Sequence, residues 1–245
     1  MKTVLKVALT CIFLSISGLT WADAEILKPF ILASKTTGAL DSVAEATKTA
    51  LTNNGFELVG TYKPYNNAVI FIVTNDELKK NAANSEHGGF GAAQRVSLTK
   101  VGNEIQVSYT NPVYMANVYR MKGQLENVKG KLATALGSLE SFGAKGMTAN
   151  EARSYHYMFG MEYFTDPSIL ATYKTHEEAV AAVEAGLAQN KFGVKSVFKI
   201  DIPGSNETLF GVALKGSGNQ KAQDDSYIMS EIDFKDLKST AHLPY

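Results

Sequence analysis

The chain has 245 residues, enough for one large or two small hydrophobic cores, and 24 basic residues balance 24 acidic ones. Arginine occurs only at Arg95, Arg120 and Arg153, so no basic stripe suited to nucleic acid is present. The single cysteine, Cys11, lies in a segment that we expect to be removed. This excludes disulfides, thiol nucleophiles and cysteine-ligated zinc from the rest of the chain.

Residues 1–24 have the pattern of a secretory signal peptide. A basic start at Lys2 and Lys6 precedes an apolar stretch from Val7 to Leu19, and Ala22-Asp23-Ala24 supplies small residues for cleavage. The apolar stretch is shorter than the roughly 20 residues that a membrane span needs, and no later stretch is long enough. We therefore expect an exported protein, periplasmic or secreted, with no membrane span in its mature chain.

Residues 25–114 predict a first α+β unit. Apolar residues at helical spacing indicate one packed helix face, and Ala68–Thr74 is apolar throughout, which is typical of a central strand. The expected elements are a strand at Phe30–Lys35, a helix at Ala39–Asn53, strands at Glu57–Lys63 and Ala68–Thr74, and a short polar helix at Asp76–Asn84.

The end of the first unit predicts its own register. Gly102-Asn103 is a two-residue hairpin signal between strands at Arg95–Val101 and Glu104–Thr110. A slip of one residue would mix the apolar and polar faces of these strands. The predicted cross-strand pairs are Val96 with Tyr109, Ser97 with Ser108, Leu98 with Val107 and Thr99 with Gln106.

Residues 115–165 predict a connector between two units. Apolar residues recur at spacings of three and four from Ala116 to Phe142, which indicates one long helix. The connector is also rich in methionine and aromatic residues, the side chains that fill irregular cores and line apolar grooves.

Residues 166–245 predict a second, incomplete copy of the first unit. The run that begins at Ile169 parallels the run that begins at Ile31, and Leu187–Phe192 parallels Leu51–Phe56. Thr175 to Glu178 form a capping box, so a helix is expected to begin there. Strands at Val194–Ile202 and Thr208–Leu214 follow, and the copy stops where the first unit has its hairpin. We expect the resulting sheet edge near Leu243 to favour a homodimer.

The predicted fold class is α+β: two tandem β-α-β-β-α-(β-β) units with mainly antiparallel sheets, joined by a long helix. Three segments, Leu51–Phe56, Val73–Asn75 and Arg95–Pro112, resemble the domain-of-unknown-function 302 family. The resemblance covers the first copy in full and part of the second, and it implies a small α+β domain that tends to pair. It implies no reaction. Relatives often carry a cysteine late in the domain, and this chain has none.

The connector also holds the candidate binding residues. Two arginines could bind an anion, and a cluster of aromatic and thioether side chains could bind an apolar or amphipathic molecule or a protein partner in the groove between the copies. These candidates are Arg120, Arg153, Tyr155, His156, Tyr157, Met158, Met161 and Tyr163. An imidazole beside two thioethers also suits Cu(I), with His156, Met158 and Met161 as the candidate ligands.

A catalytic alternative rests on histidine. His87 lies in a glycine-rich loop, interpreted as a mobile connection that could act as a lid, and His87 or His156 could serve as the base of a hydrolase. No Gly-x-Ser-x-Gly turn accompanies the loop, and no nucleophile or metal set supports an enzyme. We therefore expect a non-catalytic protein without a cofactor, and convergence of His87 with Arg120, Arg153 and His156 in one pocket would favour catalysis.

Overall fold

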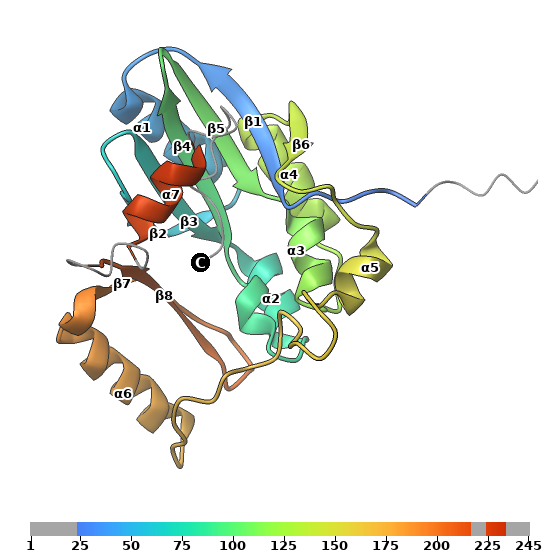
Figure 1. Cartoon of the computed structure of the whole chain (residues 1–245), viewed down its shortest axis with the longest axis vertical. Coiled ribbons are helices and arrows are strands. Elements are labelled where there is room, and N and C mark those ends of the chain that lie inside the picture. The colour runs from blue at the N-terminus through green and yellow to red at the C-terminus, as the bar shows by residue number, and fades with distance from the viewer. Residues whose placement is uncertain (1–23, 217–223, 234–245) are drawn as a thin grey trace, which may run out of the picture.

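The computed structural model describes residues 24–216 and 224–233, and it has an α+β fold with antiparallel sheets (Figure 1). A six-stranded sheet has the order β2-β3-β4-β5-β1-β6, and a two-stranded sheet pairs β7 with β8. The strands are β1 (Phe30–Thr36), β2 (Glu57–Tyr62), β3 (Ala68–Thr74), β4 (Gln94–Val101), β5 (Glu104–Thr110), β6 (Glu140–Phe142), β7 (Val194–Asp201) and β8 (Thr208–Leu214). The predicted α+β class is confirmed.

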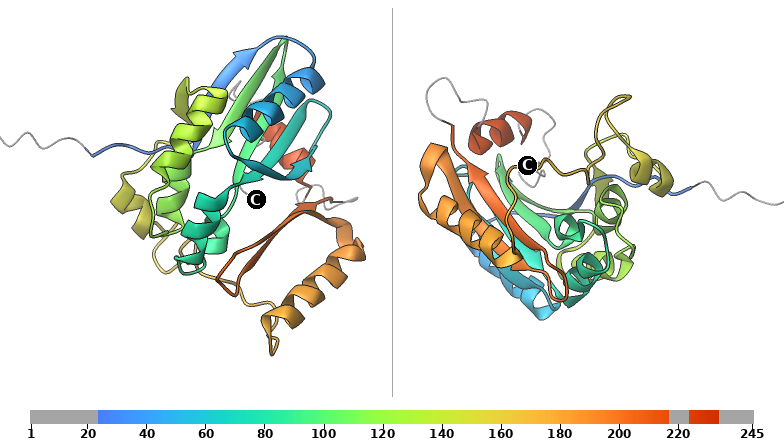
Figure 2. Two further views of the ribbon diagram at one scale, coloured as in Figure 1. Left: turned by 180° about the vertical axis from the view of Figure 1, so that it is seen from behind. Right: turned by 90° about the horizontal axis from the view of Figure 1, so that it is seen from below.

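Helices cover the sheets from several sides. They are α1 (Leu40–Asn53), α2 (Asp76–Ala83), α3 (Pro112–Val118), α4 (Glu126–Leu136), α5 (Ala149–Ser154), α6 (His176–Ala188) and α7 (Asp225–Asp233), with short 3-10 turns η1 (Gly88–Gly91) and η2 (Lys191–Gly193). The helices α1 and α4 lie together on one face of the six-stranded sheet, and α6 lies along the outer side of the β7–β8 hairpin (Figure 2).

The predicted hairpin register is confirmed. All four expected cross-strand pairs occur between β4 and β5, with Leu98 opposite Val107 as the central apolar pair. The turn residue Gly102 has φ +61°, a conformation that glycine adopts without strain. The alternation of side chains therefore sends Val96 and Leu98 into the main core and Arg95 to the opposite face.

Both faces of the six-stranded sheet are covered, because β3 is buried along its whole length. On one face Val69, Phe71 and Val73 pack in the main core beneath α1 and α4. On the other face Ile70 and Ile72 pack against Met229 of α7. At the far edge of that second face, residues of β1, β6, α3 and α5 form a separate cluster that includes Phe30, Leu32, Val113, Phe142 and Ala152.

The prediction of one long helix from Ala116 to Phe142 is wrong. The chain forms α3, a loop, α4 and then β6, and the loop contains Arg120 at φ +51° and Leu125 at φ +59°. The loop backbone bonds to α2 instead of to a helix: Gly123 N–H donates to Asn81 Oδ1 at 2.7 Å, and Asn81 Nδ2 donates to Gly123 O at 3.1 Å. These long-range bonds replace the helical ones.

The second unit repeats part of the order of the first. The order α6-β7-β8-α7 matches α1-β2-β3-α2, but the predicted opening strand at Ile169 is absent from residues 166–175, and Ile169 is 80% exposed. In the first unit β1 pairs with β5 and β6, not with β2 or β3. The described part of the second unit has no equivalent of β5, so residues near Ile169 have no strand to pair with. Whether the units arose by duplication stays a prediction.

The two sheets meet where β2 approaches β7. A Cβ at Gly60 of β2 would lie 2.9 Å from Phe198 Cβ and 3.0 Å from Val197 O of β7, a distance that only glycine tolerates without a shift. The β7–β8 hairpin therefore lies against the edge of the larger sheet, and α6 lies outside it (Figures 1 and 2).

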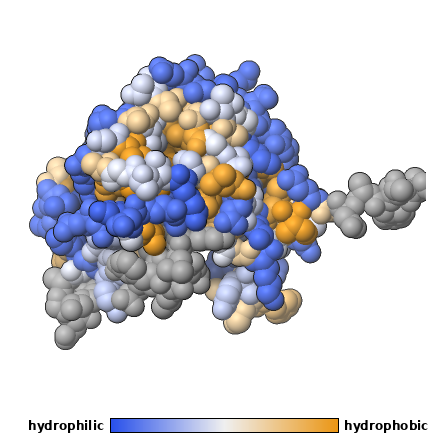
Figure 3. All heavy atoms as spheres, turned by 90° about the horizontal axis from the view of Figure 1, so that it is seen from above, coloured by the Kyte–Doolittle hydropathy of each residue, from blue (hydrophilic) through white to orange (hydrophobic). Residues whose placement is uncertain are grey.

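The molecular surface mixes polar and apolar residues. On the face shown in Figure 3, polar residues form most of the rim and apolar residues gather in patches between them. Of the helices that the structure describes, none is both long enough and apolar enough to cross a bilayer. The predicted signal peptide falls almost wholly, and the predicted dimer edge at Leu243 wholly, outside the described residues.

Candidate functional site

A cavity of about 710 Å³ lies between the second face of the six-stranded sheet and the β7–β8 hairpin. Its floor is Ile70 and Ile72 of β3, Arg95 of β4 and Phe30 of β1, and Tyr114, Val118 and Tyr119 come from α3 and the residue that follows it. The hairpin supplies Phe198, Leu209 and Val212, and α7 supplies Met229. Residues from both halves of the chain therefore line the cavity, which is partly open to solvent.

On the β7–β8 side of the cavity, the ring of Phe198 packs directly against Gly211. A Cβ at Gly211 of β8 would lie 1.7 Å from Phe198 Cε1, so the ring of Phe198 occupies the space that any other side chain would need. Gly60 in turn allows Phe198 and Val197 to approach β2. The two glycines let the hairpin close one side of the cavity, and Phe198 is half-buried there.

Arg95 is the only cationic side chain among the described residues that line this cavity. Its backbone N–H donates to Thr110 Oγ1 at 3.1 Å, and the residue lies opposite Ile72 in the sheet. Burial lowers the pKa of the Arg95 guanidinium, and the nearby Tyr119 hydroxyl acts in the opposite direction. Because a guanidinium has a very high ordinary pKa, Arg95 keeps its charge at neutral pH.

Asp225 is the only carboxylate among the described lining residues, and it is engaged by its neighbours. Its Oδ2 accepts the Leu214 N–H at 2.7 Å and the Tyr62 hydroxyl at 3.3 Å. Burial raises the pKa of Asp225 despite these bonds, and burial together with Asp225 raises the pKa of Tyr62. The bonds join the N-terminus of α7 to β2 and β8.

Arg120 and Arg153, which were predicted to bind a ligand anion, make hydrogen bonds within the chain. Arg120 Nε donates to Arg153 O at 2.8 Å, and the Arg120 guanidinium lies 3.5 Å from the centre of the Tyr163 ring. Arg153 Nη1 donates to Met121 O at 3.1 Å and to Asn117 Oδ1 at 3.4 Å. Neither arginine is among the residues that line the cavity.

Three other predicted binding residues, Tyr155, His156 and Tyr163, do not line the cavity but take part in a short ladder of paired aromatic rings. His156 and Tyr163 form an isolated antiparallel bridge, and their rings meet edge to face at 5.3 Å. Tyr155 stacks on Phe164 at 5.9 Å. Of the segment Tyr155–Phe164, only Phe164 lines the cavity, so the ladder places one edge of the segment at the cavity wall.

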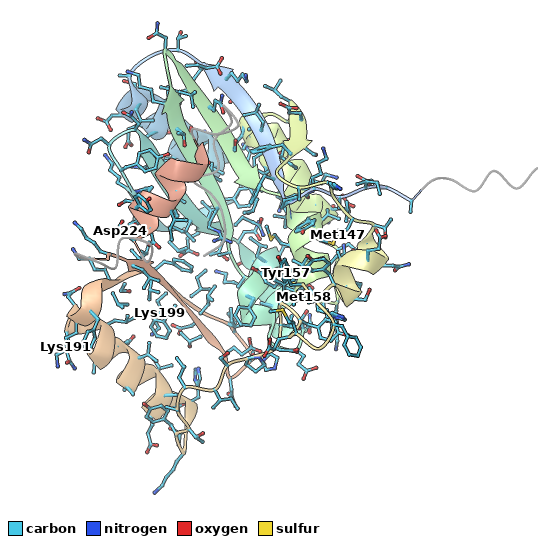
Figure 4. The ribbon with its side chains drawn as sticks, in the orientation of Figure 1. Met147, Tyr157, Met158, Lys191, Lys199 and Asp224 are labelled. Carbon is cyan, nitrogen blue, oxygen red and sulfur yellow. The ribbon has the colours of Figure 1, made fainter. Side chains whose placement is uncertain are left out.

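Tyr157, Met158 and Met161 are exposed and are not among the residues that line the cavity. Tyr157 is 72% exposed, Met158 60% and Met161 45%, and Figure 4 shows Tyr157 and Met158 on the segment that follows α5. His156 Nδ1 is buried and has no hydrogen-bond partner in the described part of the chain. The described residues contain no cluster of three histidine, cysteine or carboxylate side chains placed to hold a metal. Cu(I) binding through His156 and two thioethers stays a prediction.

The glycine-rich loop is packed, where a mobile connection was expected. It forms the 3-10 turn η1, in which a Cβ at Gly88 would lie 2.1 Å from Ala82 O and a Cβ at Gly91 would lie 2.1 Å from Met121 Sδ. Gly89 N–H donates to Glu207 Oε2 at 2.8 Å, which ties the loop to the β7–β8 turn. The glycines are explained by close packing.

His87 lies in a second, smaller cavity of about 330 Å³ between α6, β8 and η1, together with His176 and Glu207. Arg120, Arg153 and His156 do not line this cavity, so the convergence that would favour catalysis does not occur. His176 Nε2 is 3.1 Å from Thr208 Oγ1, but Thr208 donates its hydrogen to Asp201 Oδ1 at 2.9 Å. A hydroxyl has one hydrogen, so His176 acts here as a donor and not as a base that activates Thr208.

Arg95 and the hairpin wall were missed by reasoning from the sequence, although one signal pointed to Arg95. Ala68–Thr74 is apolar on both faces, which means that both faces of the sheet are covered, including the face that carries Arg95. Arg95 is half-buried on that face, and a charged side chain removed from solvent is a more informative observation than a charged side chain on the surface. Comparisons with protein-family models, curated proteins and solved structures found no match for this chain. The function is therefore argued from the cavity.

Proposed function

We propose that this protein is a non-catalytic binding module that holds a small apolar or amphipathic molecule in the cavity between its six-stranded sheet and the β7–β8 hairpin. The observation that carries the proposal is the cavity itself. Its volume of about 710 Å³ falls in the range of small-molecule sites, roughly 300–1,000 Å³.

The lining supports an apolar occupant. Aromatic and aliphatic side chains such as Phe30, Ile72, Tyr114 and Phe198 form most of the wall. Small-molecule sites typically combine such a wall with a few placed polar groups that set the orientation of the ligand. The position of the cavity between two sheets also agrees with the preference of ligands for boundaries between structural units.

Export and family membership are part of the proposal. The basic start, apolar stretch and small residues in 1–24 support secretion to the periplasm or beyond. The order strand, helix, two strands, short helix and hairpin in residues 30–110 supports a relation to the domain-of-unknown-function 302 family. A ligand-binding role also suits an exported chain in which no catalytic set is evident among the described residues.

Blocking the cavity tests the proposal. Val212 lines the cavity from β8 and is 41% exposed, so Val212→Trp should fill part of the cavity without disturbing the buried core. Leu58 of β2 is 40% exposed and does not line the cavity, so Leu58→Trp is the matched control. Thermal-shift measurements with apolar and amphipathic probes should show binding to wild type and Leu58→Trp and a loss in Val212→Trp. Equal binding to all three proteins would place the ligand elsewhere.

A further inference from the structure

Aromatic side chains are concentrated in the wall of the large cavity. Eight of the 23 described residues that line it are aromatic, whereas aromatic residues make up only 10% of the whole chain. They come from strands of both sheets, from η1, from α3 and from the segments that follow α3 and α5. An occupant of the cavity therefore meets ring faces and ring edges as well as aliphatic side chains.

Two of these rings are stacked and yet about half exposed. Phe90 of η1 stacks on Tyr119, with 5.8 Å between the ring centres and 26° between the ring planes. Phe164 stacks on Tyr155, at 5.9 Å and 16°. Phe90 is nevertheless 44% exposed and Phe164 51% exposed, and both line the cavity. Each ring therefore keeps apolar surface that a further aromatic group can cover.

Such a wall discriminates between apolar ligands of the same size. An aromatic ring that stacks on another ring, or meets it edge to face, is bound more strongly than the buried area alone predicts. The thioethers of Met115 and Met229 also line the cavity, and sulfur atoms make favourable contacts with aromatic rings. A fused ring system has no internal rotations to lose on binding, in contrast to an acyl chain.

We infer that the cavity selects a planar molecule with a fused aromatic ring system, whose rings pack against Phe90 and Phe164. This inference rests on the proposed function, because it names the chemical class of the molecule that the cavity holds. It also divides the roles within the segment Tyr155–Phe164: Phe164 contacts the ligand, and Tyr155, which does not line the cavity, supports Phe164 by stacking.

The test compares an aromatic probe with its saturated counterpart. The probes are 2-naphthalenemethanol and decahydro-2-naphthalenemethanol, which share one carbon skeleton and one neutral alcohol group. Saturation makes the second probe more apolar, so the hydrophobic effect alone would favour it. Calorimetry with the full-length protein gives both affinities for wild type, Phe90→Leu and Phe164→Leu. Phe159→Leu is the control, because Phe159 lies on the same segment as Phe164, is fully exposed and does not line the cavity.

Wild type and Phe159→Leu should bind the aromatic probe about fivefold or more tightly than the saturated probe, the effect of one or two ring pairs. Each of the two leucine variants in the cavity should reduce that ratio by about twofold or more. Both should keep their affinity for the saturated probe, because leucine leaves an apolar side chain at the same place.

Other outcomes separate the inference from the proposed function. If the saturated probe binds wild type at least as tightly as the aromatic probe, and Val212→Trp loses both, the inference is overturned and the proposed function stands. A preference for the aromatic probe that is unchanged in both Phe90→Leu and Phe164→Leu also overturns the inference. If neither probe binds wild type, or if Val212→Trp binds both undiminished, the proposed function itself is overturned.

Discussion

Arg120 lies in the loop between α3 and α4, and Arg153 lies near the end of α5; their contacts connect these two segments. Each arginine is bonded to backbone or side-chain atoms of the chain, and Arg120 also lies over the Tyr163 ring. Charge-assisted bonds of this kind contribute more to stability than bonds between neutral groups. These contacts attach the segment after α5 to the loop between α3 and α4. Phe164 of that segment lines the cavity.

Replacing Arg153 should therefore lower stability without changing the cavity. We expect Arg153→Met to lower the free energy of unfolding by about 1.5–3 kcal/mol, since it removes the charge-assisted bonds to Met121 O and Asn117 Oδ1. Urea unfolding measures the loss. The affinity for an apolar or amphipathic probe that binds in the cavity should match that of wild type, and a large drop in affinity would return Arg153 to the binding site.

The carboxylate of Asp225 should make stability depend on pH. Its pKa is raised in the folded state, so the folded protein binds more protons than the unfolded one between the unfolded pKa, about 3.9, and the higher folded pKa. The contribution of Asp225 to stability therefore falls as pH rises through that window and is constant above it.

The variant Asp225→Asn keeps an acceptor for the Leu214 N–H and removes this charge. At pH 7 it should melt at a higher temperature than wild type, and the difference should shrink as the pH falls from the folded pKa to the unfolded pKa. Melting curves at several pH values measure the difference. A gap that is the same at every pH would show that burial of the charge has no such cost.

At the scale of elements, the contact between β2 and β7 depends on Gly60. Gly60→Val would place its Cβ 2.9 Å from Phe198 Cβ, so the β7–β8 hairpin must shift. We expect a loss of about 1–3 kcal/mol, the usual range for overpacking, together with weaker ligand binding. Unfolding and calorimetry measure the two effects.

Gly130 in α4 gives the opposite result and serves as the control. Nothing lies within 4 Å of a Cβ at Gly130, and its φ is not positive. Gly130→Ala should therefore raise stability by roughly 0.5–1 kcal/mol through helix propensity alone. If Gly60→Val also left the stability unchanged or raised it, the close approach of β2 and β7 would not contribute to the stability of the fold.

Elements whose signals are local were predicted from the sequence. The helix near Leu40–Asn53, the strand Ala68–Thr74 and the β4–β5 register follow from periodicity and a two-residue turn, and the structure confirms them. Their patterns depend on residues within about ten positions of one another. The first unit and the β7–β8 strands were therefore predictable.

Elements decided by distant partners were not predictable. The break in the expected long helix is held by Asn81 and Ser85, which accept hydrogen bonds from Gly123 N–H and Lys122 N–H across about forty positions. The segment at Ile169 has a strand-like sequence but no partner strand among the described residues. The candidate site follows the same division: the groove between the units was expected, but its lining depends on long-range packing.

Across the whole molecule, burial is uneven. The strand β3 is buried throughout, whereas α6 has no buried residue and the β7–β8 hairpin is mostly half-exposed. Regions with little buried apolar surface open at a lower free-energy cost than the core. We therefore expect the β7–β8 hairpin, which α6 covers from outside, to be the wall of the cavity that opens more easily, and the six-stranded sheet to be the wall that stays fixed.

Hydrogen exchange tests this division. Amide hydrogens of β7, β8 and α6 should exchange faster than those of β3, β4 and β5, and a saturating amphipathic probe that binds in the cavity should slow exchange in the hairpin most. Mass spectrometry of peptides from the exchanged protein gives both comparisons. Uniform protection across the two sheets would show that they open as one unit.

The exposure of two thioethers has a chemical consequence. Met158 and Met161 face solvent, whereas Met115, Met121 and Met229 are at most 4% exposed. Peroxide converts accessible methionines to sulfoxides first. We therefore expect oxidants to react first at the outer segment, where a polar sulfoxide stays in contact with solvent, while the interior of the protein keeps its apolar sulfur atoms.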